Sequence, residues 1–243
     1  MRYFIEVSYK GTNYAGFQVQ HNAITIQGEV EKVLAIVFRS PVSLTGSSRT
    51  DAGVHALQNF FHLDLETAYN PAVIYNINAL LPKDIVIKSI FPVPENTHCR
   101  FSATAREYKY FISLDKNPFT TDTSWYYPYL TDMELLKKVS AILYNYTDYT
   151  AFSKRNTQVF THTCNIVTSE WIVENNTLIY TVKANRFLRG MVRGLVGTML
   201  LAARKKISIA NFESIIHSKD CTKANFATPA HGLFLVKVYY PDF

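Results

Sequence analysis

Residues 2–9 read Arg-Tyr-Phe-Ile-Glu-Val-Ser-Tyr, and apolar side chains recur in this stretch at every second position. Successive side chains of an extended chain point to opposite faces, so a period of two predicts a β-strand with one buried face. That face would carry Tyr3, Ile5, Val7 and Tyr9. From Ile26 to Val37 the apolar residues recur instead at helical spacing, which predicts an amphipathic helix directly after the strand.

The same alternation of strand and helix continues along the chain. A second strand is expected near residues 60–65. A helix should open at Asn70-Pro71, an N-cap followed by proline at the first helical position, and end at Pro82. A strand resumes at Ile85. After about residue 105 the order starts again. A strand with Tyr108 and Tyr110 on one face is followed by a helix capped by Thr131 and Glu134. Strands are then expected at 166–173 and 178–184, helices at 187–203 and after Ser208, and a last strand at 233–240.

Each half therefore follows roughly the order strand, helix, two strands, helix, strand. This is the ferredoxin-like βαββαβ pattern, met twice. We expect an α+β fold made of two related halves, residues 1–104 and 105–243, each a mostly antiparallel sheet with helices on one face. A cleft between the halves is the default place for a site.

Composition narrows the class of protein. Apolar residues make up 48% of the chain and charged residues only 18%, which indicates a folded globular protein. The 25 Lys and Arg exceed the 19 Asp and Glu, and this surplus suits a polyanionic partner such as RNA, although many basic proteins bind no nucleic acid. Three scattered cysteines give no disulfide framework and favour a reducing, cytoplasmic compartment. No secretory pattern opens the chain, and no apolar run approaches the roughly 18 residues that span a bilayer.

Residues 47–55, Ser-Ser-Arg-Thr-Asp-Ala-Gly-Val-His, are the first candidate for chemistry. Small, turn-prone residues surround Asp51, and Gly53 tolerates positive φ, so the segment can present a carboxylate on a tight loop. The alternative is a polar turn in which Asp51 caps a backbone N–H. Local composition alone favours this structural alternative.

The second candidate is the basic segment 185–193. Arg186, Arg189 and Arg193 are spaced at i, i+3 and i+7, so on a helix they would share one face and suit phosphates or a carboxylate. A solvated basic face is the alternative. Gly190, Gly194 and Gly197 each weaken a helix by about 1 kcal/mol relative to alanine, and either close packing of another backbone or mere tolerance would explain them.

Other chemistries find less support. Aromatic and basic residues interleave over 101–110, as on nucleic-acid-facing sheets, but Tyr108 and Tyr110 are more often core residues. The pairs His98-Cys99 and His162…Cys164 lack the paired spacing of a zinc site, and no phosphate-binding loop is present. The sequence therefore implies no metal and no nucleotide cofactor.

Residues 49–56, Arg-Thr-Asp-Ala-Gly-Val-His-Ala, resemble the hallmark of the TruA-type tRNA pseudouridine synthases. Further segments at 9–20, 78–85, 100–106, 183–197, 228–233 and 240–242 resemble that family's other motifs in the expected order, so the resemblance spans nearly the whole chain. The chain departs from the family at four positions. Ser48 replaces a usual Gly, Lys10 a usual Asp, Phe17 a usual Trp, and His162 stands where Arg is common.

The resemblance implies roles for four residues. Asp51 would be the catalytic aspartate, and Arg193 its salt-bridge partner, which keeps the carboxylate ionised. Tyr108 would stack on the target base and assist proton removal at C5. Arg49 would occupy the space vacated by the flipped base, which costs a few kcal/mol to extrude. The N-terminal half would thus carry the Asp loop, and the C-terminal half the stacking Tyr and the Arg helix.

The resemblance also implies the partners. The substrate would be the anticodon stem-loop of tRNA, at tRNA positions 38 to 40, bound by a homodimer without cofactor. Arg186 and Arg189 would contribute weaker tRNA contacts. Two alternatives remain: an RNA-binding protein of this fold without activity, and a purely structural α+β module. If the enzyme reading holds, Asp51, Tyr108 and Arg193 should meet in the cleft.

Overall fold

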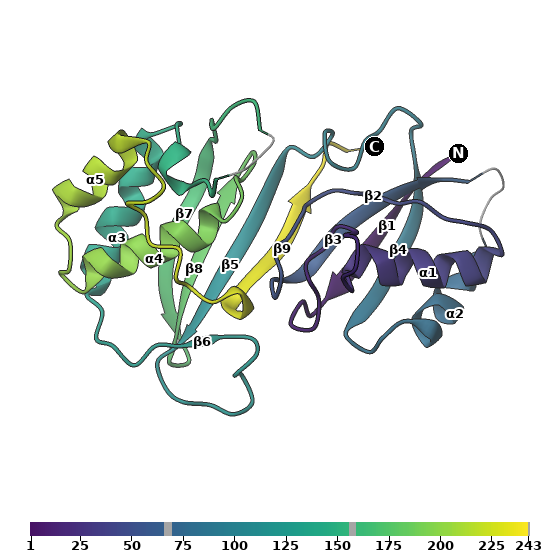
Figure 1. Cartoon of the computed structure of the whole chain (residues 1–243), viewed down its shortest axis with the longest axis horizontal. Helices are drawn as coiled ribbons and strands as arrows, with labels where there is room; N and C mark the ends of the chain where they lie inside the picture. The colour runs from purple at the N-terminus through teal and green to yellow at the C-terminus, as the bar shows by residue number, and fades with distance from the viewer. Residues whose placement is uncertain (66–69, 156–158, 243) are drawn as a thin grey trace. The chain divides into compact units, whose positions relative to one another are not determined.

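The computed structural model describes residues 1–65, 70–155 and 159–242. The chain forms two compact units: unit 1 comprises Met1–Thr104 and Phe234–Phe243, and unit 2 comprises Ala105–Leu233. Figure 1 shows the elements of each. Within the described residues, none of the helices has the length and apolar character that crossing a membrane requires.

Unit 1 is built on the strand predicted at the start of the chain. β1 (Arg2–Tyr9) pairs antiparallel with β3 (His55–Asp64) on one side and with β4 (Ile85–Val93) on the other. Short β2 (Thr45–Gly46) extends β3, and β9 (Leu233–Tyr239) returns from the end of the chain to pair parallel with it. Helices α1 (Ile26–Phe38) and α2 (Val73–Leu80) contact each other and lie together beside these strands (Figure 1).

Both faces of β1 contribute to the core of unit 1. Tyr3, Ile5, Val7 and Tyr9 are buried, as the alternation predicts. The alternation predicts that the opposite face is exposed to solvent, but Phe4 on that face is also fully buried. Its ring lies 6.0 Å from the ring of Phe91 and 5.1 Å from that of Tyr240, so the C-terminal segment covers a face that periodicity assigns to solvent.

Unit 2 is built on an antiparallel sheet in the order β5-β8-β7. Its strands are β5 (Ala105–Ser113), β7 (Ile166–Glu174) and β8 (Thr177–Ala184), and short β6 (Trp125–Tyr126) pairs parallel with β5. Asn175 and Asn176, both with positive φ, close the β7–β8 hairpin as the polar turn predicts. Three helices, α3 (Met133–Ile142), α4 (Met191–Ala203) and α5 (Ile209–Ser218), pack against one another, and α3 packs on β7. Single 3₁₀ turns occupy Leu143–Asn145, Thr150–Phe152 and Ala230–Gly232.

The predicted fold class is confirmed: the chain is α+β, its strands pair mostly antiparallel, and the order of elements repeats in two halves. Several boundaries differ from the prediction. The helix expected at 187–203 begins only at Met191, because Gly190 has φ of 73° and interrupts helical geometry before it. Asp132, not Thr131, caps α3. Asn70 accepts the N–H of Ala72, and α2 starts three residues later, at Val73.

Candidate active site

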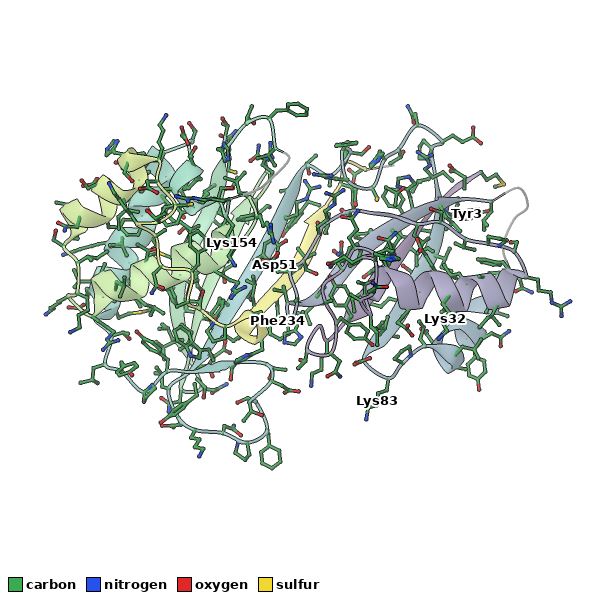
Figure 2. The ribbon with its side chains drawn as sticks, in the orientation of Figure 1. Tyr3, Lys32, Asp51, Lys83, Lys154 and Phe234 are labelled. Carbon is green, nitrogen blue, oxygen red and sulfur yellow. The ribbon has the colours of Figure 1, made fainter. Side chains whose placement is uncertain are left out.

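Asp51 lies in unit 1 on the loop between β2 and β3 (labelled in Figure 2). A tight turn begins at this residue, because the main-chain oxygen of Asp51 accepts the N–H of Val54 at 3.1 Å. Gly53 holds φ of 77° within the turn, the left-handed conformation that the sequence pattern anticipates. The loop therefore fixes the backbone on both sides of the Asp51 side chain.

A second loop, residues 10–17, packs directly against the first. A Cβ at Gly11 would lie 2.0 Å from the carbonyl oxygen of Val54, so only glycine fits there without movement of the backbone. Phe17 donates its N–H to the main-chain oxygen of Thr50 at 3.1 Å, and the Thr50 hydroxyl lies 2.8 Å from that of Tyr9. These contacts explain why two motifs far apart in sequence occur together: the loop at residues 10–17 supports the Asp51 loop.

Asn59 on β3 supplies a support that the sequence analysis missed. Its side chain is fully buried and holds both backbone groups of Ser48, accepting from the N–H at 3.3 Å and donating to the oxygen at 2.9 Å. It also donates to the Tyr9 hydroxyl at 3.2 Å. An amide side chain next to the apolar pair Phe60-Phe61 within a predicted strand is the signal that could have identified it, since buried polar groups need partners.

The carboxylate of Asp51 takes no part in holding the described residues of unit 1 together. It is half-buried, and no described residue of unit 1 forms a hydrogen bond or ion pair with it. The alternative in which Asp51 caps a backbone N–H therefore finds no support in the described part of this unit. Arg49, two residues earlier, is exposed and lines a cavity of about 230 Å³.

Arg193 lies in the first turn of α4 in unit 2. Its Nε donates to the main-chain oxygen of Thr228 at 2.8 Å, and the Thr228 hydroxyl donates to the main-chain oxygen of Arg193 at 2.8 Å. This reciprocal pair fixes the stem of the side chain. Its two terminal nitrogens form no hydrogen bond with the described residues of unit 2, so they can still bind an anion.

The predicted helical face of three arginines is wrong. Arg186 and Arg189 precede α4, because the helix starts at Met191, and only Arg193 lies on it. Arg186 donates from Nη1 to the Thr161 hydroxyl at 3.4 Å, and Arg189 is exposed. All three arginines remain candidates for phosphate contacts. Arg186 and Arg189 would make them from the irregular segment before α4, and Arg193 from the helix itself.

Tyr108 and Tyr110 neighbour each other on β5 of unit 2, and their environments differ. Tyr110 has no exposed surface and donates its hydroxyl to the main-chain oxygen of Pro229 at 2.7 Å, so it is a core residue. Tyr108 is 9% exposed, and its ring lies edge-on to that of Phe187, 5.0 Å away. Of the two tyrosines, Tyr108 is the one that keeps some exposed surface.

The glycines of α4 are explained by close packing. A Cβ at Gly197 would lie 2.3 Å from the main-chain oxygen of Asn225, and one at Gly194 would lie 2.7 Å from the ring of Phe226. Of the two explanations left open by the sequence, the close approach of another segment is the one that applies at these two positions.

The predicted site residues thus fall into two groups. Asp51 and Arg49 belong to unit 1, whereas the other four belong to unit 2: Tyr108, Arg186, Arg189 and Arg193. The meeting of Asp51, Tyr108 and Arg193 in one site stays a prediction.

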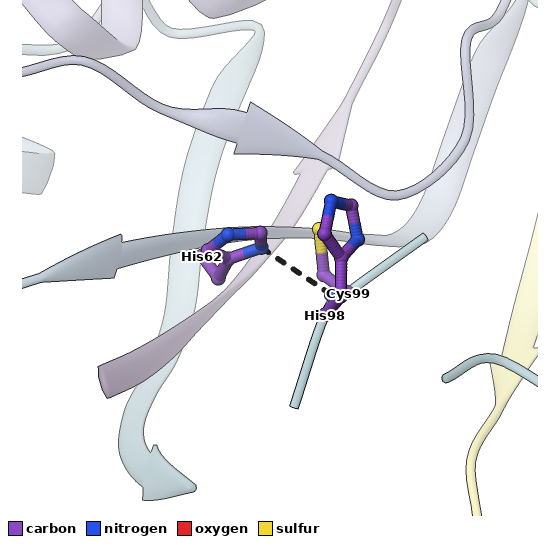
Figure 3. A group of neighbouring side chains, drawn as sticks. All are labelled: His62, His98 and Cys99. Carbon is purple, nitrogen blue, oxygen red and sulfur yellow. Dashed lines mark hydrogen bonds between the residues drawn. The ribbon is translucent and has the colours of Figure 1, made fainter. Parts of the chain in front are cut away.

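Three side chains of unit 1, His62, His98 and Cys99, bring ligand-type atoms within 4.8 Å of one another (Figure 3). Their hydrogen bonds do not suit a metal centre. Nδ1 of His62 accepts the N–H of Cys99 at 3.3 Å, and Nδ1 of His98 accepts that of Arg100 at 3.1 Å. A metal-bound histidine usually donates from its second ring nitrogen, whereas both of these nitrogens accept.

The thiol of Cys99 and the pKa of His62 also argue against a metal centre. Cys99 donates from Sγ to the main-chain oxygen of Thr45 at 3.0 Å. Burial, together with the nearby Arg2 guanidinium, lowers the pKa of His62 to about 4, which keeps the ring neutral as an acceptor. We assign the cluster as a hydrogen-bonded support for the turn that follows it.

Comparison with known proteins identifies what the chain resembles. A family model described as tRNA pseudouridine synthase matches residues 5–102 and 146–241. The tRNA pseudouridine synthase A of Parabacteroides distasonis is 42% identical over 243 residues, 99% of this chain and 96% of that protein. The protein of the same name from Porphyromonas gingivalis is 39% identical over 246 residues, 99% and 98% of the two chains. That of Staphylococcus aureus strain JH1 is 31% identical over 245 residues, 100% and 92%.

Proposed function

The chain belongs to the tRNA pseudouridine synthase family, which makes it an isomerase, and we propose that it converts uridine to pseudouridine in the anticodon stem-loop of tRNA. We propose Asp51 as the nucleophile and no cofactor. One observation carries the assignment of Asp51: its backbone is fixed on both sides, while its half-buried carboxylate has no bonding partner among the described residues of unit 1.

The reaction needs only a nucleophile and a proton carrier. The carboxylate of Asp51 attacks the target nucleotide, the glycosidic bond between N1 and the sugar carbon breaks, and the base turns. A bond then forms between C5 and the same sugar carbon, and the bond between the carboxylate and the nucleotide breaks, which returns Asp51 to its starting state. The proton on C5 moves to N1 by way of a base. No electrons are gained or lost, so acid–base and nucleophilic groups suffice.

Three further residues complete the proposed site. Arg193, held through Nε by Thr228, would pair with Asp51 through its terminal nitrogens and keep the carboxylate charged. Tyr108 would stack on the target base and take the proton from C5. Arg49 would occupy the space that the flipped base leaves, which lowers the cost of extrusion. In this proposal the residues 1–104 supply the Asp loop, and the residues 105–243 supply the stacking ring and the arginine.

The charge of the chain supports an RNA partner. The net charge of +6 attracts a polyanion, and Arg186 and Arg189, which lie near Arg193 in sequence, would contact phosphates. We propose that the protein acts in the cytoplasm as a homodimer, with one tRNA contacting both subunits.

The test is turnover of an unmodified tRNA transcript with site-resolved mapping of pseudouridine. The wild-type protein should form pseudouridine in the anticodon arm, and Asp51→Asn should abolish it with an unchanged melting temperature. Asp220→Ala is the control for a structural role: the carboxylate of Asp220 accepts the N–H of Thr222 at 3.0 Å, the task that the structural alternative gives to Asp51, and alanine has no acceptor to replace it. This control should lose stability and keep turnover.

Two results would refute the proposal. If the folded wild-type protein binds tRNA and leaves every nucleoside unchanged, the chain is an RNA-binding protein without activity. If Asp51→Asn lowers the melting temperature and retains turnover, Asp51 is a structural residue.

A further inference from the structure

Phe101 is a large apolar side chain that unit 1 holds outside its core. The ring is 75% exposed. It lies on a turn after β4, where Ser102 donates its N–H to the main-chain oxygen of His98 at 2.9 Å, and His98 donates its own N–H to the Ser102 hydroxyl at 3.0 Å. These two hydrogen bonds between His98 and Ser102 fix the backbone of the turn, and the backbone in turn keeps the Phe101 ring exposed.

The imidazole of His98 tightens the same turn. Its Nδ1 accepts the N–H of Arg100 at 3.1 Å and that of Phe101 at 3.4 Å. Burial and the charge of Arg2 lower the pKa of His98, which preserves the neutral ring that this acceptor role requires. Its ring also lies 4.3 Å from that of Phe101, at an interplanar angle of 40°, and so supports the aromatic side chain directly.

The core beneath the turn is equally well tied. Cys99 is fully buried, donates its N–H to His62 and donates its thiol to the main-chain oxygen of Thr45 (Figure 3 shows the bond to His62). The main-chain oxygen of Cys99 accepts the hydroxyl of Tyr240 from the C-terminal segment. The hydrogen-bonded cluster therefore anchors the turn that presents Phe101.

The exposed ring borders the cavity of about 230 Å³ that Arg49 lines, and we call this space the Phe101 pocket. Its other polar walls are Thr45, Arg100, His98 and the amide side chains of Gln18 and Gln27. The Gln27 amide already bonds to Glu31, Leu44 and Val19, so Gln18 is the amide considered for a ligand. The guanidinium carbon of Arg100 lies 5.6 Å from the centre of the Phe101 ring. Cations and amides thus gather around one aromatic face.

This combination suits one unpaired nucleotide. Aromatic side chains stack on bases that are not paired, arginine binds phosphate through paired N–H groups, and glutamine can both donate to and accept from a base edge. The pocket is smaller than the roughly 300–1,000 Å³ typical of sites for drug-sized ligands, so it suits a single planar group. Among the described residues, no acidic side chain lines it, which favours a polyanionic ligand.

We propose that the Phe101 pocket binds one unpaired nucleotide of the substrate RNA, with the base on the ring of Phe101 and the phosphate on Arg100. The proposal rests on the function proposed above, because the RNA is the one whose uridine Asp51 attacks. Arg49 lines the pocket and lies two residues before Asp51, so the nucleotide is bound beside the start of the catalytic loop. This subsite positions RNA and takes no part in bond breaking.

The test measures binding of unmodified tRNA by fluorescence anisotropy. Phe101→Ala should weaken binding roughly tenfold, since one base–aromatic stack contributes about that much or more, and Phe101→Tyr should restore it. Tyr75→Ala is the matched control: Tyr75 is 78% exposed on α2, is also in unit 1, and does not line the pocket. Its loss should leave binding unchanged. Equal binding by Phe101→Ala and the wild type, or equal losses in both alanine variants, would overturn the proposal.

Two measurements made side by side separate the two proposals: the turnover of Asp51→Asn and the tRNA binding of Phe101→Ala. If Asp51→Asn is inactive and Phe101→Ala binds as the wild type does, the subsite is wrong and the catalytic assignment stands. If Asp51→Asn remains active while Phe101→Ala still weakens binding tenfold, the catalytic assignment is wrong and the subsite stands. The wild type and Phe101→Ala should have equal melting temperatures, because the ring is exposed. Equal values would exclude unfolding as the cause of the weakened binding.

Discussion

At the scale of single residues, Ser48 shows how a departure from the family pattern is accommodated. The chain has serine where the family usually has glycine, and the residue is 7% exposed. Both backbone groups of Ser48 are held by Asn59, so the loop keeps its path without glycine. The hydroxyl, however, is buried and has no hydrogen-bond partner in the described part of the chain.

We therefore expect Ser48→Ala to be at least as stable as the wild type. Removing a buried hydroxyl without a partner recovers its desolvation penalty, about 1 kcal/mol. Ser48→Gly should be less stable than Ser48→Ala, by roughly 0.5–1 kcal/mol, because glycine has more backbone freedom to lose on folding. Urea unfolding of the three proteins gives the ranking. A Ser48→Ala variant clearly weaker than the wild type would mean that the hydroxyl is bonded in solution.

His62 predicts how stability depends on pH. Its pKa falls to about 4 in the folded protein from an ordinary 6.5, so between these values the unfolded chain binds a proton that the folded chain does not. The stabilisation is complete above pH 6.5 and is lost as the pH falls toward 4. Each pKa unit corresponds to about 1.4 kcal/mol, so the loss between pH 6.5 and 5 is on the order of 2 kcal/mol.

The measurement compares the free energy of unfolding of the wild type and His62→Gln across that range. His98 and His231 also have lowered pKa values and contribute to the wild-type slope, so the difference between the two proteins isolates His62. His62→Gln should be the weaker protein at pH 7 and should show the shallower slope. Identical slopes would refute the assigned role.

At the scale of elements, sequence periodicity predicted the longer strands and helices because their buried apolar positions recur at a regular spacing. Features that depend on a single backbone angle or a distant partner left no repeat. The start of α4 was misplaced because Gly190 adopts φ of 73°, while the apolar pattern runs on across it. Asn59 and His98 were missed for another reason: each acts through hydrogen bonds to the backbone of another or a following segment. The loop of Asp51 was located by its motif, whereas its supports were not.

The helical glycines give a graded prediction at this scale. Gly197→Ala places a Cβ 2.3 Å from a backbone oxygen, which cannot yield, so the loss should be largest, about 2 kcal/mol or more. Gly190→Ala forces alanine into the left-handed region, at about 1–2 kcal/mol. Gly28→Ala in α1 meets only side-chain atoms, at 3.1 Å or beyond, and alanine favours the helix, so it should be neutral or stabilising. Thermal unfolding checks the order, which a destabilising Gly28→Ala or a neutral Gly197→Ala would contradict.

At the scale of the whole molecule, the two ends of the chain belong to one unit. β9 pairs with β3, Val238 donates its N–H to the side chain of Gln58 at 3.1 Å, and the hydroxyls of Tyr240 and Ser47 are hydrogen-bonded at 3.0 Å. The last residues of the chain therefore support both the strand that follows the Asp51 loop and the turn that presents Phe101. No pattern local to either segment could predict this, because the contacts join residues nearly two hundred positions apart.

The surplus of positive charge belongs to the same scale, and it predicts how RNA binding responds to salt. Each phosphate contact releases bound counterions, so the slope of log K against log salt falls by about 0.7 to 0.9 per contact. If Arg186 and Arg189 each bind a phosphate, the double variant Arg186→Ala/Arg189→Ala should bind tRNA more weakly and with a slope smaller in magnitude by about 1.5. Lys32→Ala, an exposed cation on α1 outside the proposed site, is the control and should leave the slope unchanged. Loss of affinity with the wild-type slope would mean that the two arginines position the RNA through uncharged contacts. An equal change in the control would assign the effect to the overall charge of the chain and not to this segment.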